Sequence, residues 1–172
     1  MRLKDKVAII TGGSRGIGFA TADAFLREGA KVAVAASSEK NAEAAVEKLK
    51  AIHPDAEVVG ISPNLGSFES VKEEFDKVEK QFGRIDILVN NAGVSESTPF
   101  TSYTEADFDR VIDLNVKGVF NATRAVVDGM IKNHSGVVLN TSSMVSISGQ
   151  PSGFAYPASK FAVNGTTISL AR

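Results

Sequence analysis

The stretch Thr11-Gly12-Gly13-Ser14-Arg15-Gly16-Ile17-Gly18 decides the fold of this chain. It follows the unbroken apolar run from Val7 to Thr11 and opens a helical pattern from about Ile17 to Glu28. An unbroken β-branched run predicts a strand that is buried on both faces. Glycines between such a strand and a helix allow a tight turn, and the helix N-terminus offers free N–H groups to a pyrophosphate. The spacing G-x-x-x-G-x-G differs from the usual dinucleotide fingerprint G-x-G-x-x-G. A dinucleotide loop is our interpretation, and an ordinary glycine-rich turn is the alternative.

The same alternation of short apolar runs and longer amphipathic runs continues along the chain. It predicts an α/β fold, a doubly wound, Rossmann-like parallel sheet with right-handed crossovers and helices on both faces. The predicted strands after Val7–Thr11 are 31–35, 57–62, 85–89 and 136–141, and the predicted helices after the first are 41–52, 67–82, 105–116, 119–133 and one from 156 onward.

Length and composition set limits on the function. The 172 residues predict a single domain over 1–172, and the absence of Cys leaves no disulfide framework and no Cys-ligated zinc. The two His residues stand alone, so no metal site is expected. A net charge of −1 gives no support to nucleic-acid binding. The first apolar run is too short for a signal peptide or a membrane span, and we expect a cytoplasmic protein. The pattern from Phe161 to Arg172 is still helical where the chain stops, so we expect the protein to continue past Arg172.

Three further groups of polar residues are expected at the carboxyl edge of the sheet, where open parallel sheets bind ligands. Asn90-Asn91-Ala92-Gly93 follows the fourth strand, and Ser142-Ser143 follows the fifth. Tyr156 and Lys160 are spaced i, i+4 and share one face of a helix that Pro157 places at its first turn. A nearby ammonium lowers the pKa of a phenol, which would make Tyr156 a general acid. Each group alone could instead be a turn or a surface pair.

Taken together, the order of these motifs resembles the short-chain dehydrogenase/reductase superfamily, and the glycine spacing matches its ordinary-length branch. The Tyr lies thirteen residues after Ser143, which is the interval usual in the family. Within that branch the chain looks most like bacterial 3-oxoacyl-acyl-carrier-protein reductases and related 3-hydroxysteroid dehydrogenases. Members are usually longer, so the resemblance implies that the last two strands of the sheet are absent from this stretch.

The resemblance implies a catalytic role for four residues. Tyr156 would exchange a proton with a carbonyl or alcohol, Lys160 would lower its pKa and hold the nicotinamide ribose, Ser143 would polarise the carbonyl, and Asn115 would help hold a water that leads to the Lys. Asn64 stands where the family usually has Asp against the adenine, and Leu65 follows it. The expected cofactor-binding residues are Gly12, Ser14, Arg15, Gly16, Ile17, Gly18, Ser37, Ser38, Asn64, Leu65, Asn91, Ala92, Gly93, Tyr156 and Lys160, with Asn91 to Gly93 on the adenosine side.

The implied function is reversible hydride transfer between a nicotinamide cofactor and a carbonyl or secondary alcohol. An acyl-carrier-protein-bound 3-oxoacyl substrate, and thus fatty acid synthesis, is our first interpretation, and a 3-hydroxysteroid or other small alcohol is the alternative. A catalytically silent dinucleotide sensor or scaffold is the alternative of another class, and it would not need the Ser, Tyr and Lys. Ser95, Gln150 and Phe154 are candidates to face the substrate. A homotetramer is expected from the family.

The residues at the end of the second predicted strand favour NADP over NAD. NAD sites usually place Asp or Glu there on the ribose 2′-hydroxyl, whereas this strand ends Ala35-Ala36-Ser37-Ser38. Ser37 and Ser38 offer hydroxyl donors to a 2′-phosphate, and Arg15 offers a charge-assisted bond. Glu39 argues for NAD if it reaches the ribose diol, whereas Lys40 would neutralise it or bind the phosphate itself.

Overall fold

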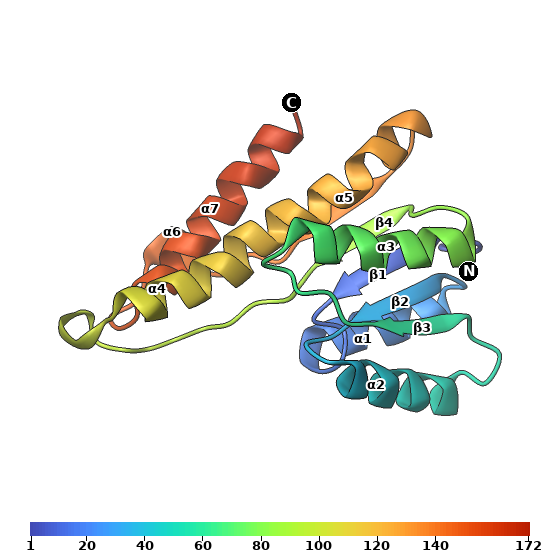
Figure 1. Ribbon diagram of the computed structural model, residues 1–172, viewed down its shortest axis with the longest axis horizontal. Coiled ribbons are helices and arrows are strands. Elements are labelled where there is room, and N and C mark those ends of the chain that lie inside the picture. Colours follow the sequence, from blue (N-terminus) through green and yellow to red (C-terminus); the bar gives the residue numbers. More distant parts are fainter.

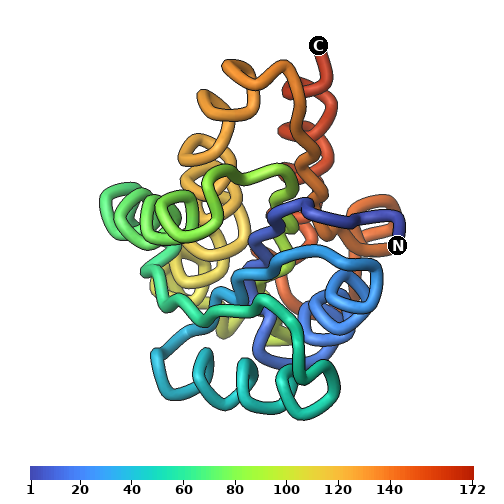
Figure 2. The backbone as a smooth tube through the Cα atoms, turned by 90° about the vertical axis from the view of Figure 1, so that its right-hand side faces the viewer, coloured from blue at the N-terminus to red at the C-terminus, as the bar shows by residue number.

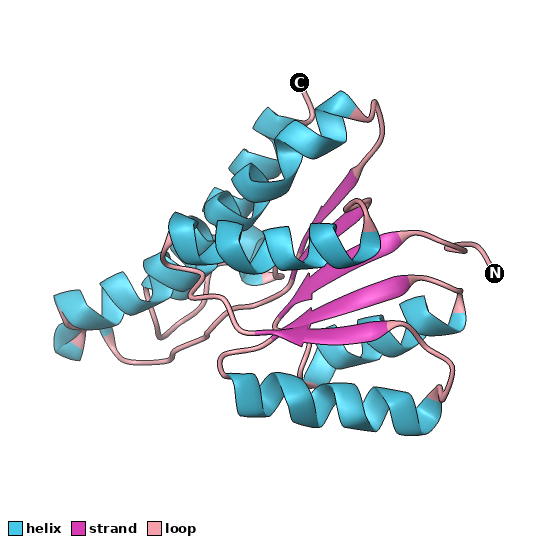
Figure 3. Cartoon of the chain, turned by 45° about the vertical axis from the view of Figure 1, so that its right-hand side comes forward, coloured by secondary structure: helices cyan, strands magenta, loops and turns pink.

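The computed structural model describes residues 1–172 and has one sheet of five parallel strands with the spatial order β3-β2-β1-β4-β5. Helices cover both faces of this sheet (Figures 1 and 3). This is the doubly wound arrangement predicted from the sequence. The strands are β1 (Val7–Thr11), β2 (Lys31–Ala35), β3 (Val58–Ile61), β4 (Ile87–Asn90) and β5 (Val137–Asn140), and the helices of the first half are α1 (Gly16–Arg27), α2 (Glu39–Ile52) and α3 (Phe68–Phe82).

Alternate residues of the central strands enter two separate cores because side chains of a strand point to opposite faces. Val7 and Ile9 of β1 pack with α3 on one face, and Ala8 and Ile10 pack with α1 and α2 on the other. The tube in Figure 2 shows α3 on the opposite side of the sheet from α1 and α2. The central strands are therefore rigid supports for the loops at their carboxyl ends.

The second half of the chain differs from the prediction in one important respect. In place of two helices at 105–116 and 119–133, the structure has one long rod: α4 (Glu105–Ile112), the π-helical turn η2 (Asp113–Lys117) and α5 (Gly118–Lys132). Gly118 has ordinary helical angles, so nothing breaks the helix there. The structure adds two short elements that the sequence reading did not include, η1 (Phe100–Ser102) and α6 (Val145–Ser148), before α7 (Ala155–Leu170).

Strand β5 lies at one edge of the sheet and is only partly covered. Val137 and Leu139 are each about half exposed, at 50% and 48%. Its other edge is joined to β4 by the ladder and by a side-chain bond from the Asn90 Nδ2 to the Asn140 Oδ1, at 2.8 Å. None of the helices combines the length and the apolar character that a membrane crossing requires.

Candidate active site

The loops after β1 and β4 are tied together by Thr11 and Asn91. The Asn91 Nδ2 donates to the carbonyl oxygens of Thr11 (3.1 Å) and Gly12 (3.2 Å). The Thr11 hydroxyl donates to the Val89 carbonyl and accepts the backbone N–H groups of Asn91 (3.0 Å) and Ala92 (3.1 Å). The Asn91 side chain therefore holds the backbone of the glycine loop in place, as an Asn after the fourth strand can do.

Two glycines of the loop are needed for close approach. Gly12 has a φ of +65°, and a Cβ there would lie 2.8 Å from the Cα of Ala92. A Cβ on Gly18 would collide with the carbonyl oxygen of Gly12 and lie 2.5 Å from the Asn91 Nδ2. Gly18 thus packs α1 against the loop and does not line the cavity that the loop borders.

A cavity of about 1050 Å³ runs along this edge of the sheet. It lies between the glycine loop, the ends of β2 and β3, one face of α2, and the loop after β4. Ser95, which was expected to face the substrate, lines this cavity. Eleven of the predicted cofactor residues also line it: Gly12, Ser14, Arg15, Gly16, Ile17, Ser37, Asn64, Leu65, Asn91, Ala92 and Gly93. A cavity at the strand ends beside a helix N-terminus has the form that a dinucleotide requires.

Helix α2 contributes two residues that the sequence reading did not include, Asn41 and Lys48. They lie on the cavity face of the helix together with Ala44 and Ala45, at spacings of three and four residues that could have pointed to them. The Asn41 Nδ2 donates to the Ser37 Oγ at 3.3 Å. Arg15 and Lys48 therefore give this end of the cavity two cationic side chains.

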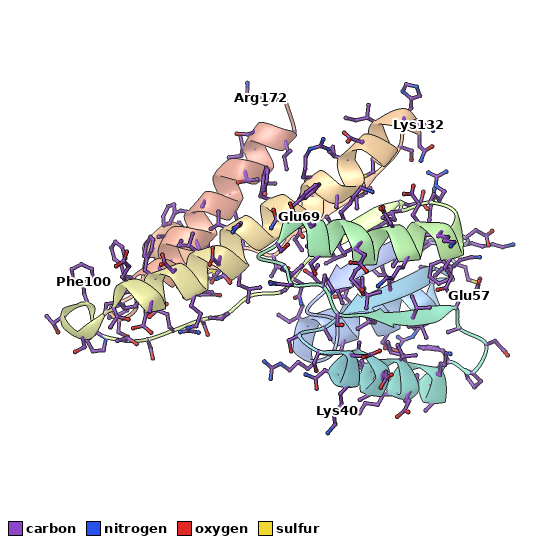
Figure 4. All side chains as sticks on the ribbon, viewed as in Figure 1. Lys40, Glu57, Glu69, Phe100, Lys132 and Arg172 are labelled. Carbon is purple, nitrogen blue, oxygen red and sulfur yellow. The ribbon has the colours of Figure 1, made fainter.

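Ser38 and Glu39 do not line this cavity. The Ser38 hydroxyl accepts the backbone N–H of Asn41 (3.3 Å) and so serves as the N-cap of α2. Glu39 borders a different groove, between α2 and α3. Lys40 projects from the start of α2 into solvent (Figure 4). The carboxylate that argued for a ribose diol is thus turned to the far side of the helix.

Asn64 and Leu65 lie at the end of β3, at the floor of the cavity. The Asn64 Oδ1 accepts the N–H of Gly66 (3.0 Å) and leaves its NH₂ group without a protein partner. The Leu65 carbonyl accepts from the Asn121 Nδ2 at 2.8 Å, which ties this turn to α5. An amide NH₂ is thus free to donate to an adenine ring at this position.

Tyr156 and Lys160 lie in the first turns of α7. The Lys160 ammonium is 5.7 Å from the centre of the Tyr156 ring and donates to the Thr141 carbonyl at 2.7 Å. Only 5% of Lys160 is exposed, and this burial lowers the pKa of its ammonium. The ammonium and the phenol thus lie on one helix face, close enough to act together in a proton transfer.

Asn115 lies in the π-helical turn η2 and is 1% exposed. Its Oδ1 accepts the N–H of Val94 (2.9 Å), and its Nδ2 donates to the Val94 carbonyl (2.9 Å) and to the Ser159 hydroxyl (3.0 Å). A Cβ on Gly93 would lie 3.2 Å from the Asn115 Oδ1 and 3.8 Å from the Lys160 Nζ. Asn115 thus lies beside the Tyr–Lys helix and joins it to the loop that borders the cavity.

Ser143 lies in the segment between β5 and α6, at the same edge of the sheet. Its Oγ accepts the N–H of Val145 at 3.4 Å, which leaves the hydroxyl proton free to donate. The neighbouring Ser142 hydroxyl bonds to the Ser146 hydroxyl (3.2 Å) and the Lys160 carbonyl (3.4 Å), which ties this segment to α7.

The two remaining substrate candidates are engaged with the loop after β4. The Gln150 Nε2 donates to the Glu96 carbonyl at 3.1 Å. The Phe154 ring lies 5.1 Å from that of Phe100, whose side chain marks one end of the molecule in Figure 4. Glu96 was not predicted, because its partners Gln150, Phe154 and Tyr156 lie more than fifty residues away along the chain.

Comparison with known proteins places these features in context. A family model described as short chain dehydrogenase matches residues 6–172. The chain is 52% identical over its whole length to a 3alpha-hydroxysteroid dehydrogenase of Mediterraneibacter gnavus, and it covers 69% of that protein. It is 40% identical over its whole length to a 3-oxoacyl-acyl-carrier-protein reductase of Thermotoga maritima, of which it also covers 69%. The crystal structure of levodione reductase superposes with a TM-score of 0.94 at 36% identity, over 99% of this chain and 66% of that one.

Proposed function

Because this chain belongs to the short-chain dehydrogenase family, whose members are NAD(P)-dependent oxidoreductases, we propose that it interconverts a secondary alcohol and a ketone. The observation that carries the proposal is the buried Lys160 beside Tyr156, at the sheet edge that also holds the glycine-loop cavity. A catalytically silent dinucleotide sensor would need the cavity alone. The presence of Ser143, Tyr156 and Lys160 therefore favours an enzyme.

The residues of the site divide the work of the reaction. When bound, the nicotinamide cofactor supplies the hydride in the reductive direction and accepts it in the oxidative one. Tyr156 gives its phenol proton to the carbonyl oxygen, or takes the proton of the alcohol. Lys160 stabilises the phenolate that results, and the Ser143 hydroxyl donates to the same oxygen. Asn115 holds the loop at Val94 and the helix at Ser159 in fixed relation.

The apolar surface around this site favours a bulky apolar substrate. Met144 and Ile147, one and four residues after Ser143, are each 81% exposed, and Phe154, two residues before Tyr156, is about half exposed. Such side chains can pack against the apolar skeleton of a substrate. They therefore reverse our first interpretation, which was a 3-oxoacyl thioester. A 3-hydroxysteroid becomes the preferred substrate class, in agreement with the name of the relative at 52% identity, and a 3-oxoacyl thioester becomes the alternative.

The adenosine end of the cavity favours NADP. Arg15, Ser37 and Lys48 line it and can donate to a 2′-phosphate, while Glu39 lies on the other groove. The cationic character of this end is therefore not opposed by a carboxylate within the cavity.

The outer faces of α5 and α7 favour self-association. Phe120 and Ile131 of α5 and Phe161 and Ile168 of α7 are all more than half exposed. These faces could pack against further copies of the chain in a homotetramer. A monomeric mass in light scattering would contradict this assembly.

Substitution of Tyr156 tests the proposed reaction. We expect Tyr156→Phe to abolish turnover of hydroxysteroids and 3-oxoacyl thioesters with either cofactor while it preserves cofactor affinity, because the phenol lies outside the adenosine cavity. Tyr103→Phe removes the only other phenol of the chain and should lower turnover far less than Tyr156→Phe does. Wild-type turnover in Tyr156→Phe would exclude the mechanism, and a wild-type protein that binds the cofactor but turns over no ketone or alcohol would favour the sensor.

A further inference from the structure

Helix α7, which carries Tyr156 and Lys160, begins without a cap of its own. Its N-cap residue Phe154 makes no side-chain capping bond, and its first turn holds no acidic residue. The first N–H groups of a helix have no partner within the helix. This turn therefore needs hydrogen-bond acceptors from another part of the chain.

Glu96, in the loop after β4, supplies the acceptor. Its Oε1 accepts the backbone N–H groups of Phe154 (3.0 Å) and Tyr156 (3.2 Å). Its Oε2 accepts the N–H of Thr98 at 3.2 Å, which fixes the orientation of the carboxylate. A negative charge at a helix N-terminus is favoured by the helix dipole, and bonds to a charged acceptor are stronger than neutral ones.

The backbone around Glu96 holds the same segment. The Glu96 carbonyl accepts from the Gln150 Nε2, and the Thr98 carbonyl accepts the N–H of Gly153 at 3.0 Å. Gly153 has a φ of +83°, and a Cβ there would lie 2.5 Å from the Glu96 carbonyl oxygen. The approach of the two segments is thus as close as the backbone allows.

The next turn of α7 is anchored by different groups. Ser159 accepts from Asn115, and Lys160 donates to the Thr141 carbonyl. Loss of the Glu96 carboxylate would therefore loosen the first turn, with Tyr156, while Ser159 and Lys160 stay anchored.

We propose that Glu96 is a positioning residue that sets the Tyr156 phenol against Lys160 and the reacting oxygen, by holding the first turn of α7 through the amides of Phe154 and Tyr156. The inference rests on the proposed function. Glu96 does not line the cofactor cavity, so its effect falls on the proton-transfer step and not on cofactor binding.

The test compares Glu96→Ala and Glu96→Gln with Glu105→Ala. Glu105 is an exposed carboxylate in the first turn of α4 that makes no side-chain hydrogen bond or ion pair, so it is the matched control. Steady-state kinetics are measured with NADPH and the best ketone of the wild type. Hydrogen–deuterium exchange of residues 153–158 is measured on the same proteins.

We expect Glu96→Ala to lower kcat by roughly 10- to 100-fold, as a small misplacement of a catalytic group does. The KM for NADPH should stay within about threefold of the wild-type value, because the disturbed turn belongs to α7 and the first turn of α7 does not line the cofactor cavity. Exchange at residues 153–158 should accelerate. Glu96→Gln keeps an amide oxygen as acceptor and should recover most of kcat, and Glu105→Ala should behave as the wild type.

Faster exchange with an unchanged kcat would overturn the positioning role and leave Glu96 a structural cap. Unchanged exchange in Glu96→Ala would overturn the proposal at its first step. A wild-type protein that turns over no ketone would instead overturn the proposed function, and the exchange result would still decide whether Glu96 holds the turn.

Discussion

The side-chain amide of Asn115 donates to the hydroxyl of Ser159 across 3.0 Å, and so joins the π-helical turn to the helix that carries Tyr156. The Ser159 hydroxyl in turn donates a hydrogen bond to the Tyr156 carbonyl at 2.7 Å. Asn115 and Ser159 are both buried, with exposures of 1% and 0%. This chain of bonds links the long α4–α5 rod to α7 at the candidate active site.

Asn115→Ala should therefore damage both stability and turnover. It leaves the N–H and carbonyl of Val94 and the Ser159 hydroxyl without this partner, and each buried unsatisfied group costs about 1–3 kcal/mol. Urea unfolding should show the loss, and kcat should fall. Asn121→Ala, which removes one bond to the Leu65 carbonyl, should cost less in both measurements. Equal effects in the two variants would contradict the special place of Asn115.

Gly18→Ala should weaken the glycine loop, because its Cβ meets the carbonyl oxygen of Gly12. We expect a destabilisation of about 1–3 kcal/mol from overpacking, together with a clear loss of cofactor affinity. Gly129→Ala is the control, since a Cβ there is 3.7 Å from its nearest neighbour, the Glu79 carboxylate. It should stabilise α5 by about 0.5–1 kcal/mol. Thermal unfolding and NADPH titration measure both effects, and an intact cofactor affinity in Gly18→Ala would contradict the packing argument.

The preference between cofactors should depend on the two cations of the adenosine end. Loss of a charge-assisted bond costs about 1.5–3 kcal/mol, so Arg15→Ala and Lys48→Ala should each lower the NADPH-to-NADH ratio of kcat/KM by about tenfold or more. Lys40→Ala should leave the ratio unchanged, because Lys40 points into solvent. A wild-type protein that prefers NADH would show that Glu39 reaches the ribose after all.

Tyr103 should titrate at high pH. Burial and then the nearby Glu96 carboxylate raise the pKa of the Tyr103 phenol above its usual value of about 10. In Tyr156→Phe this phenol is the only one left, so its phenolate absorbance can be followed alone. Adding Glu96→Gln to that protein should lower the midpoint, because it removes a negative charge.

The same shift makes a prediction for stability. The unfolded chain releases the Tyr103 proton at a lower pH than the folded chain does. Unfolding is therefore favoured as the pH rises through the unfolded pKa of about 10, and urea midpoints should fall there more steeply in the wild type than in Tyr103→Phe. Parallel curves for the two proteins would contradict the raised pKa.

Local patterns predicted the strands and the glycine loop well. Val7 to Thr11 and the residues after it form β1, the loop and α1 because buried parallel strands carry an unmistakable apolar run. The i, i+4 spacing likewise placed Tyr156 and Lys160 on one helix face, and Pro157 marked its first turn.

Long-range contacts could not be read in the same way. The roles of Glu96 and of the Asn91 amide depend on backbone atoms that are more than fifty residues away, and no local pattern records such partners. Ser38 was predicted at the cofactor and is instead the N-cap of α2, a competing use of the same hydroxyl. Asn115 lies in a π-helical turn, which has no sequence signature of its own.

The π-helical turn η2 determines how the α4–α5 helix packs against both α7 and α3. One extra residue per turn rotates everything beyond it by about 100° around the helix axis, the angle that one residue occupies in a helix of 3.6 residues per turn. The rod packs against α7 before the turn and against α3 after it, as Figure 1 lets the reader follow. The π turn thus lets one continuous helix present one face to α7 and a differently oriented face to α3. Deleting one residue between Asp113 and Lys117 would remove this rotation. The apolar faces of α4 and α5 would then lie on the same side of the helix, and one of the two would be exposed to water.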